Sequence, residues 1–148
     1  MKRLRDSKGQ GLVELTIVLP LFLVLVLAVV QFGLFFGDYQ GITDATRVAA
    51  RTASLCAYGT TAPNTAGTNA ASGLSGVTFD YSWAPAGSST FTSTSNVGNT
   101  LPCKNGSGVP IAPGDQIRVT GTSKTDSISL VFYSLNLTPT STTTVVVE

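Results

Sequence analysis

The sequence has no histidine among its 148 residues, and only two cysteines, one methionine and one tryptophan. Without histidine, the chain cannot form a Ser-His-Asp or Cys-His catalytic site or a zinc site with histidine ligands. Two cysteines are too few for a four-cysteine metal site. Charged residues make up 11% of the chain, against roughly 25% in an ordinary soluble domain. These absences predict a protein that is not an enzyme and that holds no metal or other cofactor.

The formal net charge is +1, and the positive charge is concentrated at the N-terminus. The rest of the chain after residue 9 has five basic and seven acidic side chains, a charge of −2. This balance argues against non-specific binding to nucleic acid. The first nine residues have a charge of +3, from Lys2, Arg3, Arg5 and Lys8 against Asp6.

A long apolar run follows this basic segment, and the 23 residues between Glu14 and Asp38 carry no charge. As a helix they would span about 35 Å, enough to cross a bilayer core of roughly 30 Å. Because the basic residues precede the run, the N-terminus is expected in the cytoplasm and the chain after Asp38 outside it. A cleaved secretory signal has a shorter apolar region. A plain single-pass anchor and a prepilin-type signal both fit.

The start of the apolar run has a distinctive charge pattern. At Gly9 the chain changes from basic and polar to apolar, and a single carboxylate, Glu14, follows five residues later. A carboxylate that enters a bilayer is costly and needs a partner. If the chain were cut after Gly9, the new amino group of Gln10 on a neighbouring subunit could meet Glu14 when helices bundle. The alternative is that Glu14 lies at the membrane interface among lipid headgroups.

Three features within the predicted helix concern its shape and contacts. Pro20 removes a backbone donor, which predicts a kink or a melted turn. Gly33, Gly37 and Gly41 recur every four residues and would form one smooth face that another helix can approach closely. Small side chains continue the helical pattern beyond the apolar run, and they predict a helix from about residue 11 to 57 that lies on a sheet: Ala45, Ala49 and Ala53, with Ile42 and Cys56.

The rest of the chain contains alternating patterns typical of strands. They predict a small antiparallel sheet, so the fold class is α+β, with the long N-terminal helix packed on the sheet. Residues 58–76 and 84–99 are rich in Gly, Ser, Thr and Asn and are predicted to be loops. Residues 128–137 are ambiguous between strand and a short helix or packed loop. Alternation predicts strands at 77–83 and 116–120, and a run of β-branched residues predicts a last strand at 142–147.

The two cysteines are expected to pair. Cys56 ends the predicted helix and Cys103 lies in a loop region, and both fall in the part predicted to be exported. An even cysteine count in an oxidising compartment indicates a disulfide. A bridge between them would close a loop of about 48 residues and contribute about 4 kcal/mol by the loop-entropy estimate. Two free thiols are the alternative.

Three segments together resemble the N-terminus of TadE-like proteins, the pseudopilins or minor pilins of tight-adherence (Tad/Flp) pilus systems. They are KGQGLVELTIVLP at 8–20, FG at 32–33 and ATRVAARTA at 45–53. The resemblance implies cleavage after Gly9 by a prepilin peptidase, which leaves Gln10 as the first mature residue and Glu14 at mature position five. TadF-like and TadG-like components have similar N-termini, and the length of this chain favours a TadE-like or TadF-like protein.

The resemblance therefore predicts a structural component for the assembly or the tip of a type IV-like adhesion pilus. Its implied partners are other pilins through their N-terminal helices, the prepilin peptidase, the inner-membrane assembly machinery and the membrane. Its implied place is the bacterial inner membrane, with the C-terminal part periplasmic or extracellular. One alternative is a membrane-anchored binding module outside any filament, and another is a secreted domain. The predicted segments are a leader (1–9), a membrane helix (10–37), its continuation (38–57) and a β-rich domain (58–148).

Overall fold

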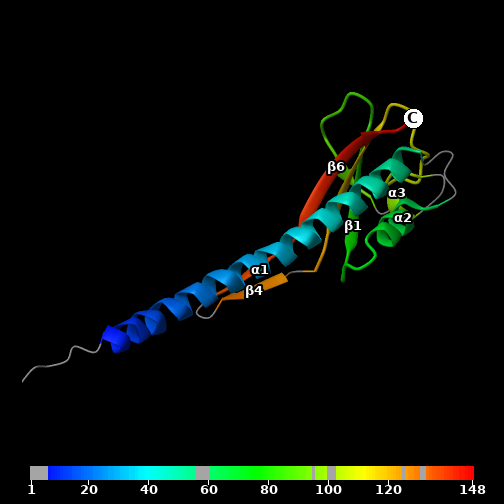
Figure 1. The fold of residues 1–148 in the computed structure, drawn as a ribbon. Coiled ribbons are helices and arrows are strands. Elements are labelled where there is room, and N and C mark those ends of the chain that lie inside the picture. The colour runs from blue at the N-terminus through cyan, green and yellow to red at the C-terminus, as the bar shows by residue number, and fades with distance from the viewer. Residues whose placement is uncertain (1–6, 56–60, 95, 100–102, 125, 131–132) are drawn as a thin grey trace, which may run out of the picture.

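The computed structural model describes residues 7–55, 61–94, 96–99, 103–124, 126–130 and 133–148 of the chain. It confirms the α+β class: one long helix, α1, packs its C-terminal part against a small sheet domain and extends beyond it (Figure 1). The helices are α1 (Ser7–Ser54), α2 (Pro63–Ala70) and α3 (Asn96–Asn99). The strands are β1 (Thr78–Ala84), β2 (Thr92–Ser93), β3 (Gln116–Thr122), β4 (Asp126–Leu130), β5 (Tyr133–Leu137) and β6 (Thr140–Val146).

Helix α1 is 48 residues long and continues through Pro20. The melted turn expected at this proline is therefore wrong. Proline deprives the Thr16 carbonyl of its donor four residues on, but the helical turns on both sides keep the backbone in register. In the turn that precedes the proline, the Thr16 side-chain hydroxyl donates to the Leu12 backbone carbonyl at 2.7 Å.

The main sheet has the strand order β2-β1-β3-β6, and every neighbouring pair is antiparallel. The strands predicted from alternation at 77–83 and 116–120 correspond to β1 and β3, and the β-branched segment predicted as a strand at 142–147 corresponds to β6. Along β3 the alternation is regular, with Ile117 and Val119 fully buried between half-buried polar residues. One face of the sheet therefore meets the core, and the other face carries the polar side chains.

Helix α1 lies against the apolar face of this sheet through small side chains. Ala49, Ala50 and Ala53 are fully buried and join the core around Ile117 and Val119. The predicted stripe is thus confirmed as a buried face of α1 at Ile42, Ala45, Ala49 and Ala53, while Cys56 lies outside the described residues. The helix comes very close to Gly121 of β3, where an added Cβ would overlap the Thr46 hydroxyl and would lie 3.0 Å from Phe79 Cε1.

The ambiguous segment 128–137 forms part of a hairpin, β4–β5, with antiparallel pairing from Asp126↔Leu137 to Leu130↔Tyr133. It continues the β3–β6 pair, whose last bond beyond the strands runs from the Ser123 amide to the Pro139 carbonyl. The hairpin lies beside α1 below the main sheet (Figure 1).

Two predicted loops contain secondary structure. Helix α2 occupies 63–70 within the predicted loop 58–76, and β2 and α3 lie within the predicted loop 84–99. Helix α2 begins with Pro63 at its first turn, where proline is tolerated. Its short polar sequence gives no apolar periodicity; tertiary packing stabilises it instead. An added Cβ at Gly67 would lie 2.9 Å from the Ala49 side chain of α1.

Asp115 ties the turn before β3 to the end of β1. Its carboxylate accepts hydrogen bonds from Trp83 Nε1 at 2.9 Å and from the Ala86 and Ala112 amides at 3.1 and 3.2 Å. The residue is only 9% exposed, so these bonds replace lost hydration. Asp115 therefore has a structural role, because its bonds hold the turn before β3 against the end of β1.

Tyr81 of β1 carries a phenol into the core. The residue is 5% exposed, and its hydroxyl has no hydrogen-bond partner among the residues that the structure describes. Burial raises the pKa of the Tyr81 phenol above its ordinary value, because the charged phenolate would lose its hydration. The core therefore holds this side chain in its neutral form.

We expect Gly121→Ala to lower the free energy of unfolding by about 1–3 kcal/mol, the usual cost of overpacking a close contact. The added methyl group would collide with Thr46 and Phe79. Urea unfolding of the full chain in detergent, followed by the fluorescence of the single tryptophan Trp83, measures this change.

Gly106→Ala is the matched control. Its added Cβ would lie 3.9 Å from the Thr94 side chain, an ordinary van der Waals contact. We therefore expect the free energy of unfolding to fall by no more than about 0.5 kcal/mol. Equal losses in the two variants would contradict the close packing at Gly121.

We expect the stability of the wild-type chain to fall above about pH 10, where the unfolded chain ionises a tyrosine that the fold keeps neutral. The contribution of the neutral Tyr81 phenol to the free energy of unfolding is fully present below that pH. Above it, this contribution falls by up to about 1.4 kcal/mol per pH unit. In Tyr81→Phe this part of the loss should disappear. Unfolding measured from pH 8 to 11 checks it, with Tyr39→Phe, which removes an exposed phenol, as the control. Identical pH profiles for wild type and Tyr81→Phe would refute the assignment.

Candidate functional site on the N-terminal helix

The N-terminal half of α1 projects beyond the main sheet (Figure 1). Its exposed apolar side chains lie around most of the helix circumference. Exposure reaches 70% at Ile17, 72% at Leu21 and 70% at Leu34. The helix is long and apolar enough to cross a membrane by length and composition. A continuous apolar surface of this extent is typical of membrane contact or of burial against other helices.

The residues predicted to take part in processing and charge pairing lie near the free end of α1. Gly9, Gln10 and Glu14 are all helical and all exposed. An added Cβ at Gly9 would meet nothing within 4 Å. The Glu14 carboxylate has no hydrogen-bond or ion-pair partner in the described part of the chain. The structure thus places these residues within one short stretch of α1 and leaves their predicted roles to be tested.

One side of the apolar half is partly covered. Val24, Ala28, Gln31 and Phe35 are half-buried at intervals of three and four residues, which is one face of a helix. Strand β4 contacts α1 alongside this region. The remaining circumference of this half is left open to lipid or to other helices.

The predicted glycine stripe divides into two parts. Gly33 and Gly37 face open space, since an added Cβ would meet nothing within 4 Å. At Gly41 an added Cβ would lie 3.1 Å from Leu74 Cδ1, so this position packs against the loop after α2 in the same chain. A contact of Gly33 and Gly37 with another helix stays a prediction.

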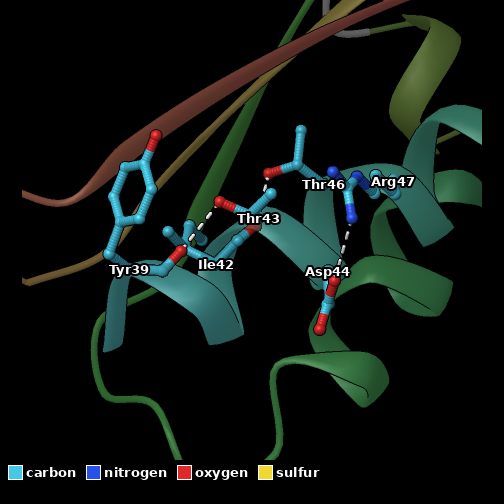
Figure 2. A network of polar contacts seen from close by, with 6 residues as sticks. All are labelled: Tyr39, Ile42, Thr43, Asp44, Thr46 and Arg47. Atoms are coloured by element: carbon cyan, nitrogen blue, oxygen red, sulfur yellow. Dashed lines mark hydrogen bonds and ion pairs between the residues drawn. The ribbon is translucent and has the colours of Figure 1, made fainter. Parts of the chain in front are cut away.

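A polar hollow of about 330 Å³ lies on α1 just beyond the apolar run, lined by Tyr39, Gln40, Thr43, Asp44 and Arg47. Figure 2 shows that Tyr39 and Thr43 lie one turn apart, where the Thr43 hydroxyl donates to the Tyr39 carbonyl at 2.8 Å. Arg47 Nη1 lies 3.4 Å from Asp44 Oδ1. Both of these side chains are exposed, so the ion pair contributes little to stability. The hollow therefore lies where α1 changes from apolar to polar residues, on the C-terminal side of the apolar run.

The predicted disulfide falls partly outside the described residues, because Cys56 is not among them. Cys103 is 2% exposed and belongs to the core cluster, with its Sγ 3.3 Å from the Val97 carbonyl oxygen. Pairing of Cys56 with Cys103 therefore stays a prediction.

Sequence reasoning missed two contacts that fix the position of α1. One is Leu74 against Gly41, and the other is α2 against Ala49 through Gly67. A leucine alone within a Gly/Ser-rich segment was the available signal, since such a side chain needs a place to be buried. Nothing in the sequence assigned that place.

Residues 9–51 match the family of TadE-like proteins. No curated protein and no solved structure matches the chain. The resemblance predicted from the sequence is confirmed over α1, and the matched residues include Gly9, Glu14, Pro20 and the glycine stripe.

We expect Gly37→Leu to weaken association between copies of α1 in a membrane several-fold while the unfolding of the sheet domain stays unchanged. The added side chain fills open space in the subunit but would hold a neighbouring helix away. Energy transfer between labelled full-length chains in nanodiscs measures association. Phe36→Leu, at an exposed neighbouring position, is the control. If Gly37→Leu associates like the wild type, the stripe is not a contact face.

Proposed function

We propose that this chain is a TadE-like minor pilin or pseudopilin, a structural component for the assembly or the tip of a Tad adhesion pilus. The observation that carries the proposal is the match of residues 9–51 to the TadE-like family, which covers the helix whose apolar half the fold leaves exposed. The family is structural, and the proposed role needs no catalytic group.

Two environments would satisfy the exposed half of α1. Lipid would cover it while the subunit waits in the inner membrane, and neighbouring α1 helices would cover it after the subunit enters a filament. The core of the main sheet packs on the C-terminal half of α1, through Ala49, Ala50 and Ala53, while β4 lies beside the apolar half. It can therefore remain folded in both environments.

Processing after Gly9 would connect the membrane and the filament states. Cleavage by a prepilin peptidase would remove the basic leader and create an amino group on Gln10. In a bundle of helices this amine on one subunit would meet the Glu14 carboxylate of another. Each charge would otherwise be poorly solvated, and an ion pair in an apolar environment is much stronger than one in water.

The proposed location follows from the charge pattern. The basic N-terminus would stay in the cytoplasm, and the sheet domain would lie in the periplasm or outside the cell. The partners would be other pilins, the prepilin peptidase and the inner-membrane assembly machinery. The polar hollow from Tyr39 to Arg47 would lie where α1 leaves the inner membrane on its periplasmic side.

The proposal is tested by the N-terminal sequence of the mature chain and by two variants. The wild-type chain is expected to begin at Gln10. Gly9→Ala should block cleavage, and Glu14→Ala should permit cleavage but abolish incorporation into pili. Both variants should retain the wild-type unfolding of the sheet domain, because both positions lie in the exposed part of α1.

Asp44→Ala is the control for Glu14→Ala, since Asp44 is an exposed carboxylate on the same helix outside the apolar run. Immunoblots of sheared pili measure incorporation. An intact Met1 in the wild type would favour a plain membrane-anchored binding module, and a start beyond about residue 30 would favour a secreted domain. Normal pili from both Gly9→Ala and Glu14→Ala would contradict the pilin mechanism.

A further inference from the structure

Strand β6 forms an open edge of the main sheet. Two flanking hydrogen bonds fix which of its residues face inward: Ser123 N donates to the Pro139 carbonyl, and Val147 N donates to the Asp115 carbonyl. Bonded pairs alternate along an antiparallel ladder, so residues 141, 143 and 145 face β3. The backbone N–H and C=O groups of four residues therefore point away from the sheet: Thr140, Thr142, Thr144 and Val146.

These outward groups have no hydrogen-bond partner in the described part of the chain, although Thr142 shares a side-chain bond with Thr120 on the sheet face. The strand also lacks the usual protection of an edge. It contains no proline and no charged residue, and Val146 is 55% exposed. Natural proteins normally guard such an edge against unwanted pairing, so an unguarded edge indicates a strand partner.

The opposite edge of the sheet offers a complementary strand. Thr94 N donates to the Tyr81 carbonyl, so Thr94 and Thr92 face β1, and Ser93 directs its backbone groups outward. Ser93 is paired with Ser82, Ser82 with Arg118, and Arg118 with Thr144. The side chains of Ser93 and Thr144 therefore lie on the same, exposed face of the sheet. Because each of the three neighbouring pairs is antiparallel, β2 runs in the opposite direction to β6.

Helix α1 decides how two copies can meet. The Glu148 amide donates to the carbonyl of Ser54, so the C-terminal ends of β6 and α1 coincide and both elements run in the same direction (Figure 1). Pairing of β6 with β6 of a second copy about a two-fold axis would make the strands antiparallel. It would also turn the two α1 helices in opposite directions. Two such chains cannot span one bilayer with both N-termini on the same side.

We infer that β6 is an interaction edge for a second copy of this chain in the same orientation, whose β2 joins β6 as the next antiparallel strand. This inference rests on the proposed function, because a shared membrane or filament imposes the common orientation. The contact is heterologous, so it adds subunits in one direction and suits a growing assembly. Strand β2 is short, so the packing of α1 helices must accompany the pairing.

Cysteine cross-linking in cells that assemble the pilus tests the inference. Two full-length chains with different tags are co-expressed, one with Thr144→Cys and the other with Ser93→Cys, and a short bismaleimide is added. We expect mixed-tag dimers several-fold above the level from two wild-type chains, which sets the background of the native cysteines. Thr120→Cys on the central strand β3, combined with Ser93→Cys, is the matched control and should stay at background.

The remaining combinations separate the possible outcomes. Dimers from Thr144→Cys on both chains would show two-fold pairing and overturn the inference. Background levels in all combinations, with a chain that starts at Gln10 and enters pili, would overturn it and leave the proposed function standing. If the chain is neither processed nor found in pili, the proposed function fails, and cross-links scored in the membrane still decide on β6. Thr142→Lys beside Thr144→Cys should reduce the mixed dimer several-fold, because it places a charge on the edge.

Discussion

The close approach of α1 to the sheet at Gly121 is the constraint on which the rest of the structure depends. Small side chains on both elements permit it, with a fully buried alanine stripe on the helix and no side chain on the strand at Gly121. Larger residues would separate the two elements and open the core around Ile117 and Val119. The same contact fixes the direction of α1 relative to β6, so the anchor also orients the sheet domain.

The sequence predicted the elements whose pattern is local. The apolar run and the alanine stripe repeat with helical spacing. Strands β1 and β3 have alternating apolar and polar residues, and β6 is rich in β-branched residues. It did not predict α2, because 63–70 has no apolar face and depends on contact with Ala49. The two residues of β2 are too few to form a pattern, and Pro20 favoured a break that the surrounding helix does not show.

The candidate site could be predicted only where its signal lies in neighbouring residues. The change of polarity at Gly9 and the carboxylate at Glu14 are visible in the sequence, and so is the spacing of Gly33, Gly37 and Gly41. The partner of Gly41 could not be predicted, because Leu74 is distant in sequence and reaches the glycine through the packing of α2. The open edge of β6 likewise depends on strand order, which no local pattern specifies.

In the proposed pilin role, the exposed half of α1 leaves lipid for a filament, and this transfer needs a driving force. Lipid tails are as apolar as leucine, so the exchange of one for the other gains little from the hydrophobic effect. Close fit and polar pairing must therefore decide. Gly33 and Gly37 leave room for a neighbouring backbone, and Glu14 has no partner in the described chain. A neighbouring subunit that packs against Gly33 and Gly37 and also pairs with Glu14 would make the filament the preferred environment of the helix.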